Sequence, residues 1–315
     1  GSEMCIRDSL NREYILKRTE EIEELEKAIA DLEDVLKRPA RIRKIIMTEL
    51  GDVAKKYGSP RKTEILYDLP DDSAADEQNE IPDYPVTVFF TREGYFKKIT
   101  PQSLRMSGEQ KLKDGDEVVY TKETTNSAEL LFFTNHAQVY KSRASEFADT
   151  KASVLGDYVA SKLEMEEGEV PLFMTVTVDY RGYMLFFYQN GKCAKIPLAS
   201  YMTKQNRRKL LKAYSDKEEL AAMLHIEEET ELAVFTSGGT GGPRLILVGS
   251  ALIPEKATRD TAGINMVTLK KNARIAKVRP AAGLELKDPH RYRVRTLPAA
   301  GALLRQEDTT EQMSL

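Results

Sequence analysis

The chain has few of the residues that build cross-links and metal centres. Its 315 residues include only two cysteines, Cys5 and Cys193, and only three histidines, His136, His225 and His290. Two cysteines cannot form a disulfide framework or a zinc cluster, and the wide spacing of the histidines matches no metal-binding motif. We therefore expect no metal site and a reducing, cytoplasmic location.

Long hydrophobic runs are also missing. No stretch approaches the roughly 18 apolar residues that a membrane-spanning helix needs, and residues 1–10 lack the apolar core of a secretory signal. With 31% charged residues and a mean hydropathy of -0.46, the composition indicates a soluble protein without a membrane partner.

Recognisable catalytic motifs are absent from the sequence as well. It contains no Ser-His-Asp order, no HExxH pair and no paired-carboxylate spacing. The loop Gly238–Gly242 looks like a phosphate cradle, but it lacks the Gly-Lys-Ser/Thr ending and is followed by Pro243. That context favours an enlarged hairpin turn. We find no complete active site and name no catalytic residue.

The chain does contain a sequence motif that occurs in four copies. Each copy is an apolar strand, a tight polar turn and a second strand with a basic residue. The copies lie at Val86–Ile99, Glu129–Lys141, Gly182–Ile196 and, more weakly, Glu231–Gly239, and their shared phenylalanines are 43, 54 and 48 residues apart. A period of about 50 residues is typical of radial β units, each about one propeller blade. The sequence predicts a mainly β, propeller-like fold of about four blades over residues 84–280.

A helical segment precedes the repeats. Its apolar positions recur every seven residues at Ile15, Ile22, Ile29 and Leu36. This heptad pattern predicts a coiled-coil helix over about residues 10–37, and a second helix is expected from about residue 40 to residue 57. An apolar seam of this kind needs a partner helix, which either a second copy of the chain or an arm outside this sequence would supply.

Composition marks the remaining boundaries. Residues 66–83 are acidic and poor in large apolar side chains, which predicts a flexible linker. The stretch 281–315 lacks periodicity and is expected to be disordered, and residues 1–9 fit neither part and are expected to be a remnant. The repeats at 84–280 carry 28 Lys and Arg against 24 Asp and Glu, whereas residues 10–83 carry 13 against 19. The repeats are thus the basic part of the chain, which hints at a polyanionic partner.

Basic residues follow the turns of successive repeats at equivalent places. In a radial fold such residues would gather on one rim, which could bind a phosphate backbone without reading bases and could bend it. The alternative is an ordinary solvated charged surface. The candidate DNA-binding residues are Lys97, Lys98, Arg105, Lys111, Lys113, Lys141, Arg143, Lys192, Lys195, Arg207, Arg208, Lys209, Lys270, Lys271 and Arg274.

The order of these segments resembles one known family, the A subunits of bacterial type IIA topoisomerases, which are those of DNA gyrase and topoisomerase IV. Two features carry the resemblance. One is the segment at the end of the second helix, Tyr57-Gly58-Ser59-Pro60-Arg61-Lys62-Thr63-Glu64-Ile65, and the other is the set of Phe-Phe-Thr strands that follow it. The resemblance covers about residues 10–280. It implies that residues 10–65 are a coiled-coil arm and return helix, and that residues 84–280 are a β-pinwheel that binds DNA.

The resemblance also implies an activity and partners for the full enzyme. Such an enzyme cuts both DNA strands through a tyrosine–DNA bond with Mg²⁺. It then passes a second duplex using ATP on a partner B subunit, and its A subunits form a homodimer in the bacterial cytoplasm, associated with the nucleoid. The family's catalytic tyrosine precedes the coiled coil and has no counterpart in this sequence. We therefore expect an inactive fragment without a cofactor of its own.

One departure from the family bears on the type of enzyme. Where the gyrase A subunit carries a basic glycine-rich box, this chain reads Leu104-Arg105-Met106-Ser107-Gly108-Glu109-Gln110-Lys111. The degenerate box favours a topoisomerase IV-like or divergent gyrase A subunit. Two alternatives stay open, a propeller scaffold that binds protein and a stand-alone accessory protein that bends DNA.

Overall fold

The computed structural model describes residues 11–59, 81–203 and 208–308. They fall into two compact units, divided after residue 76. The expected remnant at 1–9 and most of the expected linker at 66–83 lie outside the described residues. Among the described helices, none is long and apolar enough to cross a membrane.

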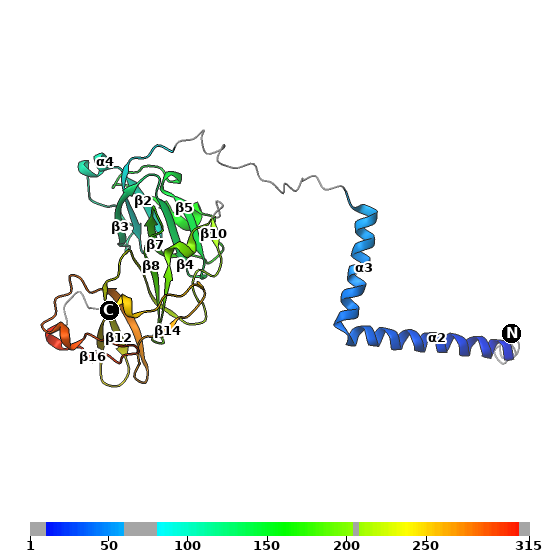
Figure 1. Cartoon of the computed structure of the whole chain (residues 1–315). Helices are drawn as coiled ribbons and strands as arrows, with labels where there is room; N and C mark the ends of the chain where they lie inside the picture. Colours follow the sequence, from blue (N-terminus) through cyan, green and yellow to red (C-terminus); the bar gives the residue numbers. More distant parts are fainter. Residues whose placement is uncertain (1–10, 60–80, 204–207, 309–315) are drawn as a thin grey trace. The chain divides into compact units, whose positions relative to one another are not determined.

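The first unit consists of two helices, α2 (Arg12–Lys37) and α3 (Pro39–Tyr57) (Figure 1). The side chain of Asn11 caps α2 by accepting a hydrogen bond from the backbone N–H of Glu13. Proline has no N–H to donate and is favoured at the first helical position, so Pro39 starts α3. Both helices predicted from the sequence are therefore present, with bounds close to those expected.

The heptad seam of α2 is exposed in the described part of the chain. Ile22, Leu25, Ile29 and Leu32 are each between 55% and 63% exposed. The return helix joins α2 through polar groups instead, because Arg41 lies 2.8 Å from Asp31 and 2.7 Å from Asp34. The apolar seam thus has no partner helix among the residues that the structure describes.

The second unit is built from four sheets of four antiparallel strands, which we number as blades 1 to 4. Blade 1 has the order β3 (Val118–Thr125), β1 (Pro85–Thr91), β2 (Tyr95–Ile99), β6 (Asp157–Tyr158). Blade 2 has the order β7 (Pro171–Thr177), β4 (Glu129–Thr134), β5 (Val139–Arg143), β10 (Lys209–Leu210). Blade 3 has the order β11 (Leu220–Ile226), β8 (Tyr183–Tyr188), β9 (Lys192–Pro197), β14 (Ile264–Asn265). Blade 4 has the order β15 (Ala273–Pro280), β12 (Glu231–Gly238), β13 (Arg244–Gly249), β16 (Ala302–Leu303).

Every blade therefore has the same plan. A central hairpin is flanked by a third strand (β3, β7, β11 or β15) on its first strand and by a closing strand (β6, β10, β14 or β16) on its second. The closing strand of each of blades 1 to 3 follows the central hairpin of the next blade along the chain. Neighbouring blades are thereby interlocked. The predicted mainly β, four-bladed, propeller-like fold is confirmed.

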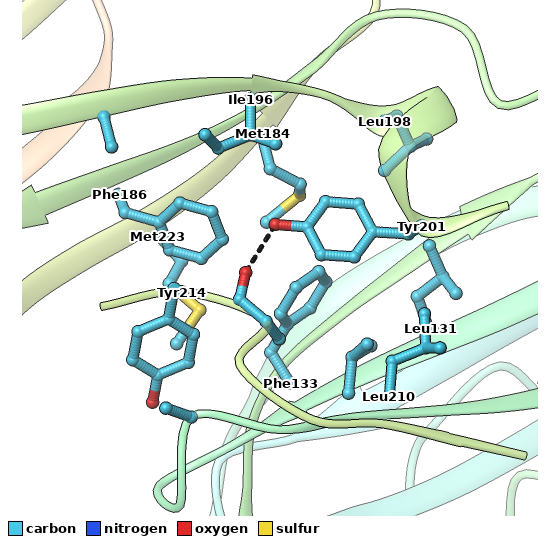
Figure 2. Packing of buried hydrophobic residues seen from close by; sticks show 14 of the residues in the cluster. Leu131, Phe133, Met184, Phe186, Ile196, Leu198, Tyr201, Leu210, Tyr214 and Met223 are labelled. Carbon is cyan, nitrogen blue, oxygen red and sulfur yellow. Dashed lines mark hydrogen bonds between the residues drawn. The ribbon is translucent and has the colours of Figure 1, made fainter. Parts of the chain in front are cut away.

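Aromatic side chains fill the space between blades, as Figure 2 shows for blades 2 and 3. Phe133 of β4 meets Phe186 of β8 edge-on with ring centres 5.8 Å apart, and Tyr214 stacks on Phe186 at 5.2 Å. The hydroxyl of Tyr201 donates to the carbonyl of Ala213 at 2.6 Å, so this buried polar group is satisfied (Figure 2). Successive residues along β4 and β8 are buried, so both faces of these hairpins belong to the core.

Short helices complete the blades. One follows the second hairpin strand in every blade: α4 (Pro101–Met106), η3 (Ala144–Glu146), η4 (Leu198–Tyr201) and η5 (Ser250–Leu252). Of the other described short helices, α5 (Val159–Lys162) follows β6, η6 (Pro289–Arg291) lies between β15 and β16, and η7 (Gln306–Asp308) follows β16.

The expected disorder after residue 280 differs from what the structure shows. Residues 281–308 return to blade 4, where β16 closes the sheet against β13. Tyr292 is buried; its hydroxyl donates to Asp308 at 2.6 Å and its carbonyl accepts the N–H of Leu247 at 2.8 Å. These long-range contacts leave no periodic signal in the sequence. Residues 309–315 lie outside the described part of the chain.

Candidate nucleic-acid interface

Three candidate cations, Lys98, Lys141 and Lys195, occupy the same place in blades 1 to 3. The strand register aligns them on the second strand of each central hairpin. Lys98 and Lys195 are only 2% and 3% exposed, and the side chain of Lys141 is 10% exposed. The expectation that these lysines line an exposed rim is therefore wrong, because both faces of their strands pack against protein.

Their ammonium groups bind oxygen atoms of neighbouring segments. Lys98 Nζ donates to Asn126 Oδ1 at 2.6 Å, in the turn that leads into blade 2. Lys195 Nζ donates to the carbonyl of Ser250 at 3.2 Å and to the carboxylate of Glu229, which lies in the turn that leads into blade 4. Lys141 Nζ donates to Thr203 Oγ1 at 3.0 Å, in the segment that follows β9 of blade 3. Each lysine thus ties its own blade to the next one.

A tyrosine ring accompanies each of the three lysines. The ammonium lies 5.8 Å from the ring centre of Tyr84 for Lys98, 5.2 Å from Tyr180 for Lys141, and 4.3 Å from Tyr183 for Lys195. Such contacts favour a cation that has been removed from water. In blade 4 the register puts Leu247 at this place. The recurring lysine is therefore a structural element of the first three blades.

Lys97, another candidate, is 1% exposed and also serves the fold. Its Nζ donates to the backbone carbonyls of Lys111 at 2.9 Å and Ala152 at 3.2 Å. Burial lowers the pKa of Lys97. The buried cation joins two surface segments, and both segments carry an exposed lysine.

Those segments form one exposed basic surface, the blade 1 patch, which consists of Arg105, Lys111 and Lys151. Leu104 of α4 and Ala152 share one apolar cluster, so the three cations are held on neighbouring segments. All three are exposed, and none pairs with a carboxylate among the described residues. Lys151 was not predicted from the sequence, because only the folded contact between the backbones of Lys111 and Ala152 places it here.

Several other candidates are already paired with the protein's own acids. The pairs are Lys113 with Glu93 at 3.7 Å, Lys192 with Glu218 at 3.1 Å, Arg208 with Glu146 at 3.7 Å, and Lys209 with Glu166. Arg143 is half-buried at the end of β5, and Arg207 lies outside the described residues. Because a paired cation must break a contact before it can bind phosphate, the four paired residues are weaker candidates.

The last three candidates form a second exposed surface. Lys270, Lys271 and Arg274, the blade 4 patch, lie in and just after the turn that leads into β15, and all are exposed. None of them pairs with a carboxylate among the described residues. Apart from Arg143 and Arg207, the structure therefore separates the predicted set into buried structural lysines, paired surface cations and two unpaired patches.

One cluster has the composition of a cation site. Ligand atoms of His136, Glu166 and Glu169 lie within 4.8 Å of one another. Its oxygens are already engaged, because Glu169 accepts the hydroxyl of Tyr140 at 2.8 Å and Glu166 binds the ammonium of Lys209. A bound cation would be opposed by the lysine, so the cluster is better described as a network that joins β5, β10 and the turn before β7.

The sequence of this chain is similar to those of named bacterial proteins. No family model matches it. The DNA gyrase A subunit of Streptomyces coelicolor is 29% identical over 202 residues, which cover 61% of this chain and 23% of that protein. The DNA topoisomerase 4 A subunit of Staphylococcus aureus is 25% identical over 255 residues, which cover 79% of this chain and 31% of that protein. The chain thus spans less than a third of the length of these relatives.

Solved structures share the fold. A C-terminal domain of DNA topoisomerase IV superposes with a TM-score of 0.59 at 19% identity, over 70% of this chain and 73% of that one. The C-terminal domain of E. coli ParC superposes with a TM-score of 0.52 at 13% identity, over 70% of this chain and 94% of that one. The chain is a homologue of the A subunits of bacterial type IIA DNA topoisomerases, and its blades have the β-pinwheel fold of their C-terminal domains.

Proposed function

We propose that the four blades bind and bend duplex DNA, and that they do so within the A subunit of a type IIA topoisomerase, where they support ATP-dependent strand passage. The parent enzyme would act as a homodimer together with an ATP-binding B subunit, with Mg²⁺ at a cleavage site outside this sequence. The degenerate box at 104–111 supports a topoisomerase IV-like or divergent gyrase A subunit.

The observation that carries this proposal is the pair of unpaired cationic patches on blades of this family's fold. The blade 1 patch and the blade 4 patch each expose three cations without a carboxylate partner among the described residues. The two patches belong to the first and last blades, and bending of the DNA is the part of the proposal in which one duplex contacts both of them. Contacts of this kind neutralise phosphates and carry no sequence information.

The test is a gel shift of the full chain on a linear duplex and on a small nicked circle that is then closed by ligase. Binding to the linear duplex, together with a change in the linking number of the closed circles, is the expected result. Binding without any change in linking number would remove the bending part of the proposal. If no shift occurs even at low salt, the blades would be a protein-binding scaffold instead.

A further inference from the structure

A short segment crosses the free edge of the second hairpin strand in blades 1, 3 and 4, and we call it the strap. It runs parallel to that strand and meets it in one bridge. The bridged pairs are Lys98 with Asp149, Lys195 with Glu255, and Leu247 with Arg293. The third strands of neighbouring blades contact one another at the opposite edge of the sheets, β3 with β7 and β11 with β15. The straps therefore lie on the outer edges of the blades.

The straps of blades 1 and 3 carry no net charge. In blade 1, residues 148–151 contain one acid and one lysine, and the acid, Asp149, lies 3.2 Å from the ammonium of Lys98. In blade 3, residues 254–257 likewise contain one acid and one lysine. Blade 4 has Leu247 in place of the buried lysine, and its strap has Arg293 in place of the acid. The strap of blade 4 therefore differs from the others in charge.

The fold holds the strap of blade 4 while its arginines face outward. Tyr292 is 1% exposed, and the N–H of Val294 donates to the carbonyl of Leu247 at 3.0 Å. Val294 packs against the apolar cluster between blades 3 and 4. The residues that alternate with these two are all exposed arginines: Arg291, Arg293 and Arg295, the arginine strap. Because the backbone is already fixed, a ligand of these arginines would not have to order it.

The acids of the protein neutralise one of these arginines. Arg293 binds Glu231 through two hydrogen bonds, from Nε at 2.7 Å and from Nη2 at 3.2 Å. Neither Arg291 nor Arg295 pairs with a carboxylate in the described ranges of the chain. A guanidinium presents a planar set of donors that matches the geometry of a phosphate. Two cations of this kind are therefore available to an anionic ligand.

The composition of this surface favours a phosphate backbone over a protein partner. Residues 289–296 expose no large apolar side chain. A protein interface has an apolar centre from which charged residues are depleted, whereas nucleic-acid backbones are bound by exposed arginines and lysines. The ligand that fits the arginine strap is thus a polyanion.

We propose that the arginine strap is a further DNA contact of the blades, in which Arg291 and Arg295 bind phosphates of a duplex at the outer edge of blade 4. The choice of DNA as the polyanion rests on the proposed function. The candidate list from the sequence omits both residues, because the segment after residue 280 was expected to be disordered. The segment that closes the last blade thus also binds the ligand.

The direct test removes the two unpaired charges. We expect Arg291→Gln combined with Arg295→Gln to weaken binding of the full chain to a short duplex of random sequence about tenfold, and to reduce the magnitude of the salt slope by about two. Fluorescence anisotropy across a salt series measures both. If the wild-type chain binds and the double variant keeps its affinity and slope, the strap proposal is overturned and the proposed function stands. If the wild-type chain binds no duplex at low salt, both fail.

A matched pair controls for net charge. Arg92→Gln combined with Arg181→Gln makes the same charge change at two exposed arginines that are already paired, with Glu117 and with Glu228. We expect this control to change the slope by less than about 0.5. An equal loss in both double variants would reduce the effect to net charge and overturn the proposal.

A conservative pair separates charge from packing. Arg291→Lys combined with Arg295→Lys keeps both positive charges, so we expect it to retain the wild-type salt slope. A loss as large as that of the glutamine pair would mean that charge is not what these side chains contribute, and it would count against the phosphate contact.

A cross-linking experiment tests where the duplex lies. Thr296 is exposed beside Arg295, and Val178, after the third strand of blade 2, is 71% exposed away from the outer edges. We expect a photoreactive benzoylphenylalanine to cross-link the duplex when it replaces Thr296 but not when it replaces Val178. Cross-linking from residue 178 without cross-linking from residue 296 would place the DNA elsewhere and refute the strap, although the chain would still bind DNA.

Discussion

The ammonium group of Lys195 lies 4.3 Å above the centre of the Tyr183 ring, with both groups belonging to the central hairpin of blade 3. The same ammonium donates to Glu229 and to the carbonyl of Ser250 in the segments that form blade 4. A cation in this setting is bound by the protein on every side. It therefore holds two blades together and is not available to a phosphate.

The first prediction follows from this burial. Lys195→Met keeps an unbranched side chain of similar length but leaves the carbonyl of Ser250 without its donor. We therefore expect the free energy of unfolding to fall by about 2 kcal/mol. Urea unfolding followed by circular dichroism measures this change. Lys151→Met, at an exposed position, should alter stability by less than about 0.5 kcal/mol. DNA affinity that falls for Lys195→Met, measured where the variant is fully folded, would contradict the structural role.

A second prediction concerns the blade 1 patch. Replacing Arg105, Lys111 and Lys151 together by alanine should reduce the magnitude of the salt slope of DNA binding by about three, because each removes one phosphate contact. Lys287→Ala is the control, since Lys287 pairs with Glu307 at 3.0 Å. Fluorescence anisotropy across a salt series gives the slopes. A triple variant with the wild-type slope would show that DNA does not contact this surface.

The third prediction concerns pH and begins with His225 on β11. Its Nδ1 lies 2.7 Å from Thr175 Oγ1, and its Nε2 lies 3.1 Å from the carbonyl of Arg181. Burial lowers the pKa of His225, and the nearby charge of Lys122 lowers it as well. The hydrogen bond to the Arg181 carbonyl and the charges of two nearby acids, Glu227 and Asp179, oppose this shift.

The sign of the effect on stability follows from that lowered pKa. Below about pH 6.5 the histidine of the unfolded chain takes up a proton that the folded chain resists, so the unfolded state binds more protons. We expect the free energy of unfolding to fall as the pH drops from about 6.5 towards the lower folded pKa. His225→Gln should flatten this part of the profile. An unchanged slope between pH 7 and pH 5 would place the titrating group elsewhere.

A fourth prediction concerns the thiol of Cys193. This residue is 1% exposed in the core between blades 3 and 4, and burial raises the pKa of its thiol. Because the thiolate is the reactive form, iodoacetamide should not modify Cys193 in the native chain but should modify it fully in denaturant. Mass spectrometry of the peptide that contains Cys193 distinguishes these states. Rapid native modification would mean that blades 3 and 4 separate readily.

The sequence was sufficient to predict the repeated hairpins but not the charges that face water. The apolar strand, turn and basic strand of each repeat coincide with the two strands of a central hairpin, as in Glu129–Thr134 and Val139–Arg143. In a sheet with one solvent-exposed face, the alternation of apolar and polar residues along a strand would show which lysines are exposed. Here both faces pack against neighbouring blades, so Lys98 and Lys195 are as buried as the phenylalanines beside them.

The closing strands and the last segment could not be predicted for a different reason. Strands such as Asp157–Tyr158 and Ala302–Leu303 contain only two residues each, too few for a periodic pattern, and they pair with residues far away in the sequence. Pairing across blades therefore carries information that a linear reading does not contain.

The central claim is that the blades bind duplex DNA through phosphate contacts. The most direct measurement is the affinity of the full wild-type chain for a duplex of random sequence across a salt series. If about five phosphates are neutralised, the logarithm of the association constant should fall against the logarithm of salt concentration with a slope of about -4 to -5. A slope near zero, or no binding at the lowest salt concentration, would contradict this claim.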